Sequence, residues 1–194
     1  IIKKSIETGV DINDITKKYE AEFWKNLSDL HVMSPDIITR VTDHVPTIID
    51  FIKKILKKDL CYITSDKSIS FDTEKYGKYG KLQKPQHRED EISSISKKSS
   101  TDFALWKSHK EGEPFWEAEW GNGRPGWHIE CSAMASRLFG STVDIHAGGI
   151  DLQFPHHENE EAQSCAYHGS NQWVSYWIHT GHLHLKNDVK MSKS

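Results

Sequence analysis

Apolar residues recur every three to four positions along the first part of the chain, which is the spacing of amphipathic helices. One helix is expected to begin at an N-cap formed by Asn13 or Asp14. A second fits residues 43–58, with Pro46 in its first turn, where a proline is tolerated. The apolar stripes that define the two helices are Ile12, Ile15, Tyr19, Phe23, Leu27 and Leu30, and then Ile48, Ile49, Ile52, Ile55 and Leu56.

The middle of the chain changes to short apolar runs that favour β-strands. Residues 61–64 and 69–71 predict a hairpin, and residues 103–106 return to strand character after a polar stretch. That stretch, residues 84–101, is rich in Ser, Lys, Glu and Asp and has no period. It predicts a long surface loop.

The last third of the chain alternates between helix and strand patterns. Helices are expected over 128–139 and from Pro155 to about residue 168, and strands over 143–146 and 173–178. Gly148-Gly149, after the first of these strands, predicts a turn. Such alternation is typical of a parallel α/β sheet.

Two regions of different character follow from these patterns. We expect an α/β fold in which a mostly helical, partly β insertion over about 20–120 comes before half of a doubly wound sheet over about 121–194. The chain has 194 residues, begins at Ile1 rather than Met, and stops at Ser194 directly after a motif-like sequence. We therefore interpret it as an internal piece of a longer protein.

Charge and cysteine usage narrow the class of protein. The chain has 25 Lys and Arg against 28 Asp and Glu, a net charge of −3, which argues against a nucleic-acid-binding surface spread over the whole chain. Its three cysteines have no close spacing, and such an odd set favours a reducing compartment such as the cytoplasm. No apolar run is long enough to span a membrane, and no signal peptide opens the chain.

One cysteine, one histidine and one glutamate have a spacing that suits a metal ion. His156 and Glu160 are four positions apart on a predicted helix and so share one face. Cys131 lies on the preceding predicted helix, which a parallel α/β unit can bring alongside. Thiolate, imidazole and carboxylate are good Zn²⁺ ligands, and zinc prefers four, so the fourth would be a residue elsewhere, a water or a substrate atom. His157 competes with His156 for this role, and a buried cysteine beside a surface His–Glu pair explains the same residues equally well.

A second group of residues gathers where the strand before Gly148-Gly149 is expected to end. Ligands of doubly wound sheets bind at the carboxyl ends of strands, and two glycines there allow a ligand to approach the backbone closely. Asp151 could accept a hydrogen bond from a ribose hydroxyl, and His146 would point into the same crevice. Trp127 could stack on a base or a side chain at its mouth. A plain turn and a core tryptophan are the simpler interpretations.

The end of the chain carries a pair of lysines, Lys190 and Lys193, around Met191-Ser192. Two lysines three positions apart on a loop could neutralise charge that grows on phosphates during their transfer. A K-x-x-K pattern alone is common and says little.

Three motifs carry a specific resemblance: GRPGWHIECSAM (Gly123 to Met134), DIHAGGIDLQFPHHENEEAQS (Asp144 to Ser164) and KMSKS (Lys190 to Ser194). With them the chain resembles the cysteinyl-tRNA synthetases, a family of class I aminoacyl-tRNA synthetases. Residues 39–71 and DFALWK (Asp102 to Lys107) are also similar to that family. The resemblance covers nearly the whole chain, and its motifs are long and jointly specific.

The resemblance implies a Rossmann-like catalytic domain split by a connective insertion. Residues 1–20 would end its first half, residues 21–120 would form the insertion, and residues 121–194 would form the second half with the zinc site and the KMSKS loop. It implies activation of L-cysteine by ATP, with Mg²⁺, to cysteinyl-adenylate, and then transfer to tRNA(Cys). It also implies one zinc ion that binds the substrate thiolate. A monomer in the cytoplasm is expected.

Roles follow from the resemblance residue by residue. The zinc ligands would be Cys131, His156 and Glu160, and the residues beside the cysteine substrate would be Trp127 and His146. The adenosine moiety would be bound by Gly148, Gly149 and Asp151. The catalytic loop over the ATP phosphates would contain Lys190 and Lys193, and Lys193 would contact the transition state.

Some features of the family are missing from this sequence. The HIGH signature is absent, and so is the zinc-binding cysteine that lies just ahead of it; Cys61 is the nearest cysteine upstream of Cys131 and lies in no such motif. The anticodon-binding helical domain is absent too, and residues 117–120 differ from the Ser-Pro-Trp usual there. We therefore expect this piece alone neither to activate cysteine nor to charge tRNA, whereas the parent protein should do both.

Three other functions fit parts of the sequence. A related zinc-dependent ligase that transfers cysteine to an amino sugar shares adenylation and zinc. A zinc hydrolase would use Cys131, His156 and Glu160 with a bound water, but the H-E-x-x-H signature is absent and the lysines at the end of the chain would have no role. A non-catalytic zinc- or tRNA-binding module suits the isolated piece better than its parent.

Overall fold

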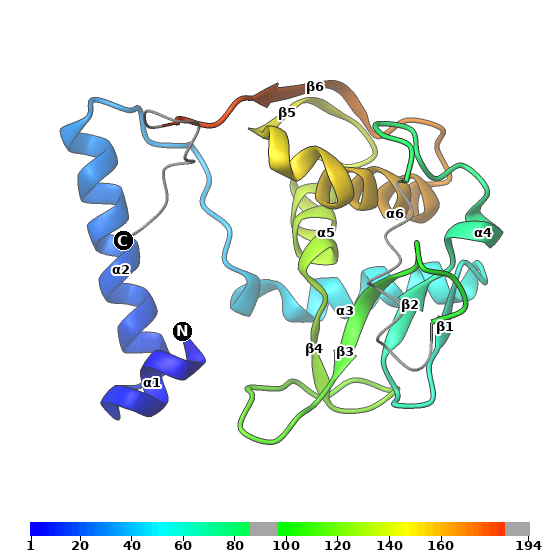
Figure 1. The fold of residues 1–194 in the computed structure, drawn as a ribbon, viewed down its shortest axis with the longest axis horizontal. Helices are drawn as coiled ribbons and strands as arrows, with labels where there is room; N and C mark the ends of the chain where they lie inside the picture. Colours follow the sequence, from blue (N-terminus) through cyan, green and yellow to red (C-terminus); the bar gives the residue numbers. More distant parts are fainter. Residues whose placement is uncertain (86–96, 185–194) are drawn as a thin grey trace. The chain divides into compact units, whose positions relative to one another are not determined.

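Contacts divide the chain into two compact units, Ile1–Arg40 and Val41–Ser194 (Figure 1). The computed structural model describes residues 1–85 and 97–184, with the backbone alone at Ile2 and Lys3. Each unit is described by itself below. In the part of the chain that is described, no helix is both long and apolar enough to cross a membrane.

The first unit contains two helices, α1 (Ile2–Thr8) and α2 (Ile12–Asp29). The N-cap of α2 is Asp11, whose backbone is extended and whose side chain accepts a hydrogen bond from the backbone N–H of Asn13. The prediction that Asn13 or Asp14 forms the cap is therefore wrong. Asn13 and Asp14 lie inside the first turn of the helix. An N-cap residue instead comes just before the helix, where its side chain can accept a hydrogen bond from a backbone N–H of the first turn.

The predicted apolar stripe of α2 is largely exposed within this unit. Ile15 is buried, whereas the side chains of Tyr19 and Phe23 are 51% and 54% exposed. The apolar period thus predicted the helix correctly, but two helices of this size do not bury the stripe that defines it.

The second unit begins with α3 (Val41–Lys57), whose apolar stripe does enter a core. Ile48, Ile52 and Ile55 are completely buried, as the spacing predicted. The helix starts two residues earlier than expected, so Pro46 lies in its second turn rather than its first. Because proline has no N–H, this turn lacks one of its helical hydrogen bonds.

A four-stranded antiparallel sheet follows, with its strands in the order β1-β2-β3-β4. The predicted hairpin and the strand that begins near residue 103 are confirmed, and the one-turn helix α4 leads away from β2. Residues 86–96, most of the predicted long loop, lie outside the described residues. The elements are β1 (Cys61–Ile63), β2 (Ile69–Phe71), α4 (Thr73–Tyr76), β3 (Phe103–Ser108) and β4 (Gly123–Pro125).

One hydrophobic core joins this sheet to three helices. Phe71 and Leu105 from the sheet pack with Ile52 of α3, with Ile129 of α5 (Trp127–Phe139), and with small residues of α6 (Glu158–His168). All of these large side chains are buried. The sheet, α3, α5 and α6 therefore form one body, and the positions of α5 and α6 are set by the same packing.

Two parallel strands, β5 (Val143–Gly149) and β6 (Val174–Thr180), form a second sheet. This confirms the parallel α/β unit that the alternation of elements predicted. Gly148 and Gly149, however, do not form a turn. They are the last two residues of β5 and pair with His179 and Thr180 of β6, because glycine is compatible with an extended backbone when the ladder continues.

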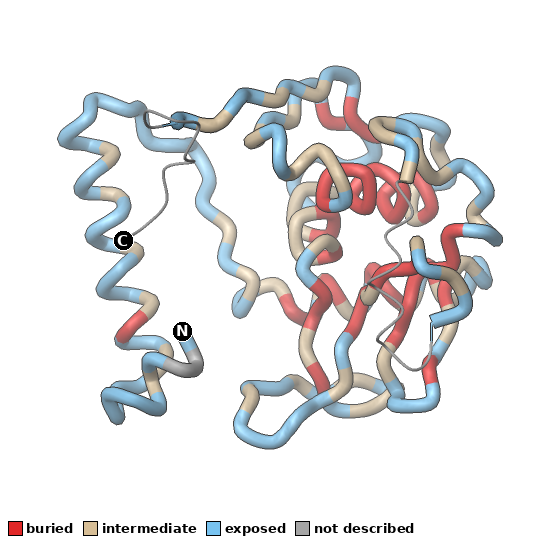
Figure 2. The backbone as a smooth tube through the Cα atoms, viewed as in Figure 1, coloured by how far each residue is buried: buried red, intermediate tan, exposed pale blue. Residues whose placement is uncertain are grey.

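The chain enters α6 later than predicted. A 3-10 turn (Ile150–Leu152) and a wide π-type turn (Gln153–His157) precede the helix, which begins at Glu158 rather than at Pro155. Phe154 has an extended backbone, so a regular helix cannot run through it. Residues 156–166 are all buried, and Figure 2 shows this buried colour along most of α6.

Candidate functional site

The start of α6 and the first turns of α5 lie side by side, and buried polar side chains join them. The amide nitrogen of Gln163 lies 2.7 Å from both the hydroxyl of Ser132 and the backbone carbonyl of His128. The Ser132 hydroxyl donates in turn to the backbone carbonyl of Glu160, at 3.3 Å. Since all of these groups are buried or partly buried, they hold the two helices in one register.

The predicted metal ligands meet at this junction. Nε2 of His156 lies 2.8 Å from Oε1 of Glu160 and 3.7 Å from Sγ of Cys131. One donor atom from each residue lies within 4.8 Å of the other two. His156 is in the wide turn rather than in the helix itself, yet it still faces Glu160 one turn later. The wide turn before α6 and the packing of α5 against α6 therefore bring a thiol, an imidazole and a carboxylate together.

Glu160 has the environment of a carboxylate that faces a cation. Its side chain is completely buried, and both carboxylate oxygens lack a hydrogen-bond donor among the described residues apart from the imidazoles beside them. One oxygen lies 2.8 Å from His156, and the other lies 3.6 Å from Nε2 of His146. A buried carboxylate without donors is unfavourable unless a positive charge compensates it, so the donor set fits a metal ion.

The thiol of Cys131 needs a cation in order to ionise here. Burial, and next the charges of Glu160 and Glu130, raise its pKa to about 12. A bound divalent ion would reverse this effect, because coordination favours the thiolate.

Two aromatic residues next to Cys131 contact His156 directly. The indole of Trp127 is 56% exposed and stacks on the His156 ring, with ring centroids 4.3 Å apart. Nδ1 of His128 lies 2.8 Å from Nδ1 of His156. Trp127 thus lies between the His156 ring and solvent, and His128 contacts the nitrogen of His156 that faces away from Cys131 and Glu160.

A second set of donors, His146, His157 and Glu160, lies on the other side of the Glu160 carboxylate. The rings of His146 and His157 are 4.7 Å apart, and Nδ1 of His157 lies 2.8 Å from Nε2 of His179 on β6. Burial, and next the charge of His146, lower the pKa of His157 to about 3. Sequence spacing left the choice between His156 and His157 open, and geometry gives each histidine its own set with Glu160 in common.

The predicted adenosine positions lie at the ends of β5 and β6. A Cβ atom at Gly148 would lie 2.7 Å from Cε1 of His157, so this position has no room for a side chain. Asp151 lies just beyond, with Oδ1 2.8 Å from Nε2 of His182. Lys190 and Lys193 lie outside the described residues.

Residues that the sequence did not single out complete the surroundings. Glu158 and Glu161 in the first turn of α6 are both buried, and so is Asn159. Glu158 and Asn159 bond to Gly80 and Tyr79, which are 78 and 80 residues away in sequence, whereas Glu161 accepts from Trp173 just before β6, 12 residues away. The sequence signal for these buried residues was the run of acidic and amide side chains at residues 158–161. That run could not show which distant segments would supply their hydrogen-bond partners.

Comparison with known proteins gives consistent results for the whole chain. The family model described as "tRNA synthetases class I (C) catalytic domain" matches residues 1–194. The chain is 46% identical to a "Cysteine--tRNA ligase, cytoplasmic" of Dictyostelium discoideum and 48% identical to a "Probable cysteine--tRNA ligase, mitochondrial" of Xenopus tropicalis. It is also 48% identical to a "Cysteine--tRNA ligase" of Aeropyrum pernix.

These similarities extend over all of this chain but only part of each relative. The chain spans 31% of the Dictyostelium protein, 34% of the Xenopus protein and 41% of the Aeropyrum protein. The shared part contains Cys131, His156 and Glu160 and the elements that bring them together.

Proposed function

This chain belongs to the family of class I tRNA synthetase catalytic domains, and from that premise we propose that its parent protein activates L-cysteine with ATP and transfers it to tRNA(Cys). The observation that carries the proposal is that Cys131 and His156 meet the buried carboxylate of Glu160, which has no other hydrogen-bond donor in the part of the chain that the structure describes. The names of the relatives, all cysteine–tRNA ligases, support the amino acid and the acceptor.

The proposed reaction has two steps. A carboxylate oxygen of cysteine attacks the α-phosphorus of Mg²⁺-ATP, and the bond to pyrophosphate breaks. A hydroxyl of the terminal ribose of the tRNA then attacks the carbonyl carbon, and AMP leaves. We propose that Lys190 and Lys193 stabilise charge on the phosphates in the first step, with Lys193 in contact with the transition state.

Cys131, His156 and Glu160 would hold one zinc ion, and a further ligand would come from the parent protein. A zinc ion held by these residues would favour the thiolate form of the cysteine substrate. A serine hydroxyl is a poorer ligand and far harder to deprotonate, so we propose that serine is rejected at binding, without a separate editing site.

The chain's own residues would shape the rest of the site. We propose that Trp127 and His146 line the pocket for the cysteine substrate on opposite sides of Glu160. Trp127 would exclude water from the donor groups through its stack on His156. Gly148, Gly149 and Asp151 would bind the adenosine moiety at the ends of the parallel strands, where such folds bind nucleotides.

We also propose the domain division that the resemblance implies. Residues 1–20 would end the first Rossmann half, residues 21–120 would be the connective insertion, and residues 121–194 the second half. The change from an antiparallel to a parallel sheet occurs after β4 (Gly123–Pro125), a few residues beyond the proposed boundary at residue 120, and supports a division in this part of the chain. The isolated chain is proposed to be inactive, and the parent a monomer of the cytoplasm, a location that the name of the Dictyostelium relative also carries.

The test is pyrophosphate exchange into ATP by the full-length parent protein, with cysteine and then with serine, before and after removal of zinc by a chelator. We expect exchange with cysteine alone, lost on chelation and restored by zinc. Exchange with no amino acid would contradict the adenylation reaction. A transfer assay with tRNA(Cys) and with an amino sugar then separates the proposed ligase from a related ligase with a sugar acceptor.

A further inference from the structure

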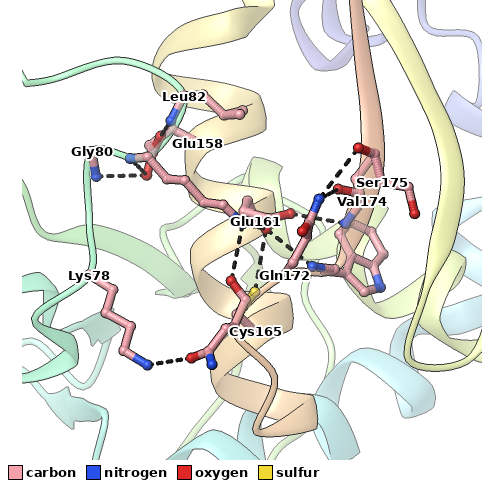
Figure 3. Close-up of polar contacts among 12 residues, drawn as sticks. Lys78, Gly80, Leu82, Glu158, Glu161, Cys165, Gln172, Val174 and Ser175 are labelled. Atoms are coloured by element: carbon pink, nitrogen blue, oxygen red, sulfur yellow. Dashed lines mark hydrogen bonds and ion pairs between the residues drawn. The ribbon is translucent and has the colours of Figure 1, made fainter.

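A short segment of the insertion crosses the start of α6 and is bound there by buried carboxylates. This segment, Tyr79–Gln83, is called the strap below. The side chain of Glu158 is 1% exposed and accepts hydrogen bonds from four backbone N–H groups of the strap. Figure 3 shows Glu158 between Gly80 and Leu82. One oxygen accepts from Gly80 and Lys81 at 2.7 and 3.0 Å, and the other accepts from Leu82 and Gln83 at 2.6 and 3.4 Å.

This arrangement satisfies a charge that would otherwise be costly to bury. Four consecutive N–H groups form a concave site for an anion, and hydrogen bonds to a carboxylate are stronger than those between neutral groups. The same contact satisfies four backbone donors of a segment that has no regular secondary structure. Glu158 and the strap therefore depend on each other for their position.

The neighbours of Glu158 attach the same turn of α6 on two more sides. The Tyr79 hydroxyl lies 2.6 Å from Oδ1 of Asn159, which extends the contact with the strap. Glu161 accepts from Nζ of Lys81 at 2.5 Å and from the backbone N–H groups of Trp173 and Val174 at 3.1 and 3.2 Å. The first turn of α6 is thus joined to the insertion and to β6.

Glu160 is the remaining residue of this turn, and it faces the metal donors instead. Three of the four residues from Glu158 to Glu161 are engaged by protein groups outside the helix, whereas both oxygens of Glu160 are left to the imidazoles of His146 and His156. The strap also reaches the turn that carries His156, because the Gln153 side chain donates to the backbone carbonyl of Leu82 at 3.3 Å. Contacts with the strap therefore constrain the turn that carries His156 and Glu160, in addition to the packing of α6 in the core and its hydrogen bonds to α5.

We propose that Glu158 is a positioning residue for the metal site: by binding the strap it fixes the turn that presents His156 and Glu160 to Cys131. This inference rests on the proposed function for the metal itself. It adds that a loop of the insertion, remote in sequence, sets the geometry of the donors. Groups that orient metal ligands without touching the metal typically change its affinity by about 10- to 100-fold when they are removed.

The test compares cobalt binding by the full-length parent protein with binding by its Glu158→Gln variant. Glutamine keeps the size of the side chain but presents an amide to N–H groups that need an acceptor. We expect cobalt affinity, measured by competition with a chelator, to fall about 10- to 100-fold. We also expect the thiolate-to-cobalt absorption at saturating cobalt to change, because Cys131 and His156 no longer meet in the same geometry.

Asp102→Asn is the matched control. Asp102 is also a buried carboxylate that holds a loop, and the hydrogen bonds it accepts come from Tyr62, Thr73 and Ser99, none of which lies in the strap or in α6. It should lower stability while cobalt affinity and absorption stay as in the wild type. Equal losses of cobalt affinity in both variants would reduce Glu158 to a general structural role and overturn the proposal.

Two further outcomes are decisive. If Glu158→Gln does not fold, the test uses Tyr79→Phe, which removes only the hydroxyl that binds Asn159. Unchanged cobalt affinity and absorption in Tyr79→Phe would then overturn the proposal. If the wild-type protein binds no cobalt, the metal assignment is overturned. If the wild type and Glu158→Gln bind cobalt with the same affinity and absorption, only the role of the strap is overturned.

Discussion

The Nδ1 atoms of His128 and His156 lie 2.8 Å apart, so one ring donates a hydrogen bond to the other. Burial, and next the charge of His156, lower the pKa of His128 to about 3, which keeps its ring neutral. Since Nε2 of His156 faces Cys131 and Glu160, a proton on its Nδ1 leaves Nε2 free to act as a metal ligand. His128 is then the acceptor that holds His156 in this tautomer.

Replacement of His128 should therefore weaken metal binding. In His128→Phe the ring volume is kept but the acceptor for His156 is lost, and we expect zinc affinity to fall about 10-fold. Competition with a chelator measures this. His168→Phe is the control, because His168 is also partly buried between α5 and α6 but bonds to Ser136 instead. Equal zinc affinity in the wild type and His128→Phe would contradict the role of His128.

Cys131→Ser should lower zinc retention and the preference for cysteine over serine together, because the variant loses the thiolate ligand. Zinc content after dialysis and pyrophosphate exchange with each amino acid measure the two effects. Cys61→Ala, which removes a buried thiol from β1, should retain both properties. If zinc content and the cysteine-to-serine ratio in Cys131→Ser both remain at the wild-type value, Cys131 is not a ligand.

The core between α3 and the antiparallel sheet should respond strongly to loss of volume. Ile52 is completely buried, and Ile52→Ala is expected to lower the free energy of unfolding by about 2–5 kcal/mol. Ile63 on β1 is 55% exposed, and Ile63→Ala should cost about 1 kcal/mol or less. Denaturant unfolding measures both. Similar losses in the two variants would mean that the packing described for Ile52 is wrong.

His168 should make the protein less stable in mild acid. Burial, and next the charges of Lys54 and Lys58, lower the pKa of His168 in the folded state. The unfolded chain then binds more protons, so the stability present above the ordinary pKa of about 6.5 is lost as the pH falls below it.

The His168→Gln variant checks this sign. Glutamine cannot titrate but can still bond to Ser136, so its free energy of unfolding should fall less between about pH 8 and about pH 5 than that of the wild type. Parallel pH profiles of the two proteins would show that His168 does not contribute.

Local patterns predicted most of the elements that carry the site. The apolar stripe of α3, the hairpin of β1 and β2, and the alternation that leads to the parallel β5–β6 pair all depend on residues close together in sequence. Local patterns were less reliable at boundaries. Asp11 rather than Asn13 or Asp14 caps α2, and the chain runs extended through Phe154 before α6 starts.

In the candidate site, too, local spacing predicted some features and left others undecided. Spacing brought His156 and Glu160 onto one face and marked Cys131 as a third donor, because helical periodicity is a local property. Spacing could not choose between His156 and His157. That choice depends on the wide turn before α6, which directs one histidine to Cys131 and the other to His179.

What the sequence by itself determined is the set of elements and side chains: an α/β chain with a parallel unit, helices and a β-hairpin ahead of it, and a thiol, imidazoles and a carboxylate at spacings that can converge. The tertiary structure decided which of these groups meet and what holds them there. Glu158 and the four strap residues that donate to it are 75 to 78 residues apart in sequence, and these backbone donors find their acceptor only after the strap has packed on α6. Contacts of that kind depend on packing between distant segments, which no local pattern of side chains encodes.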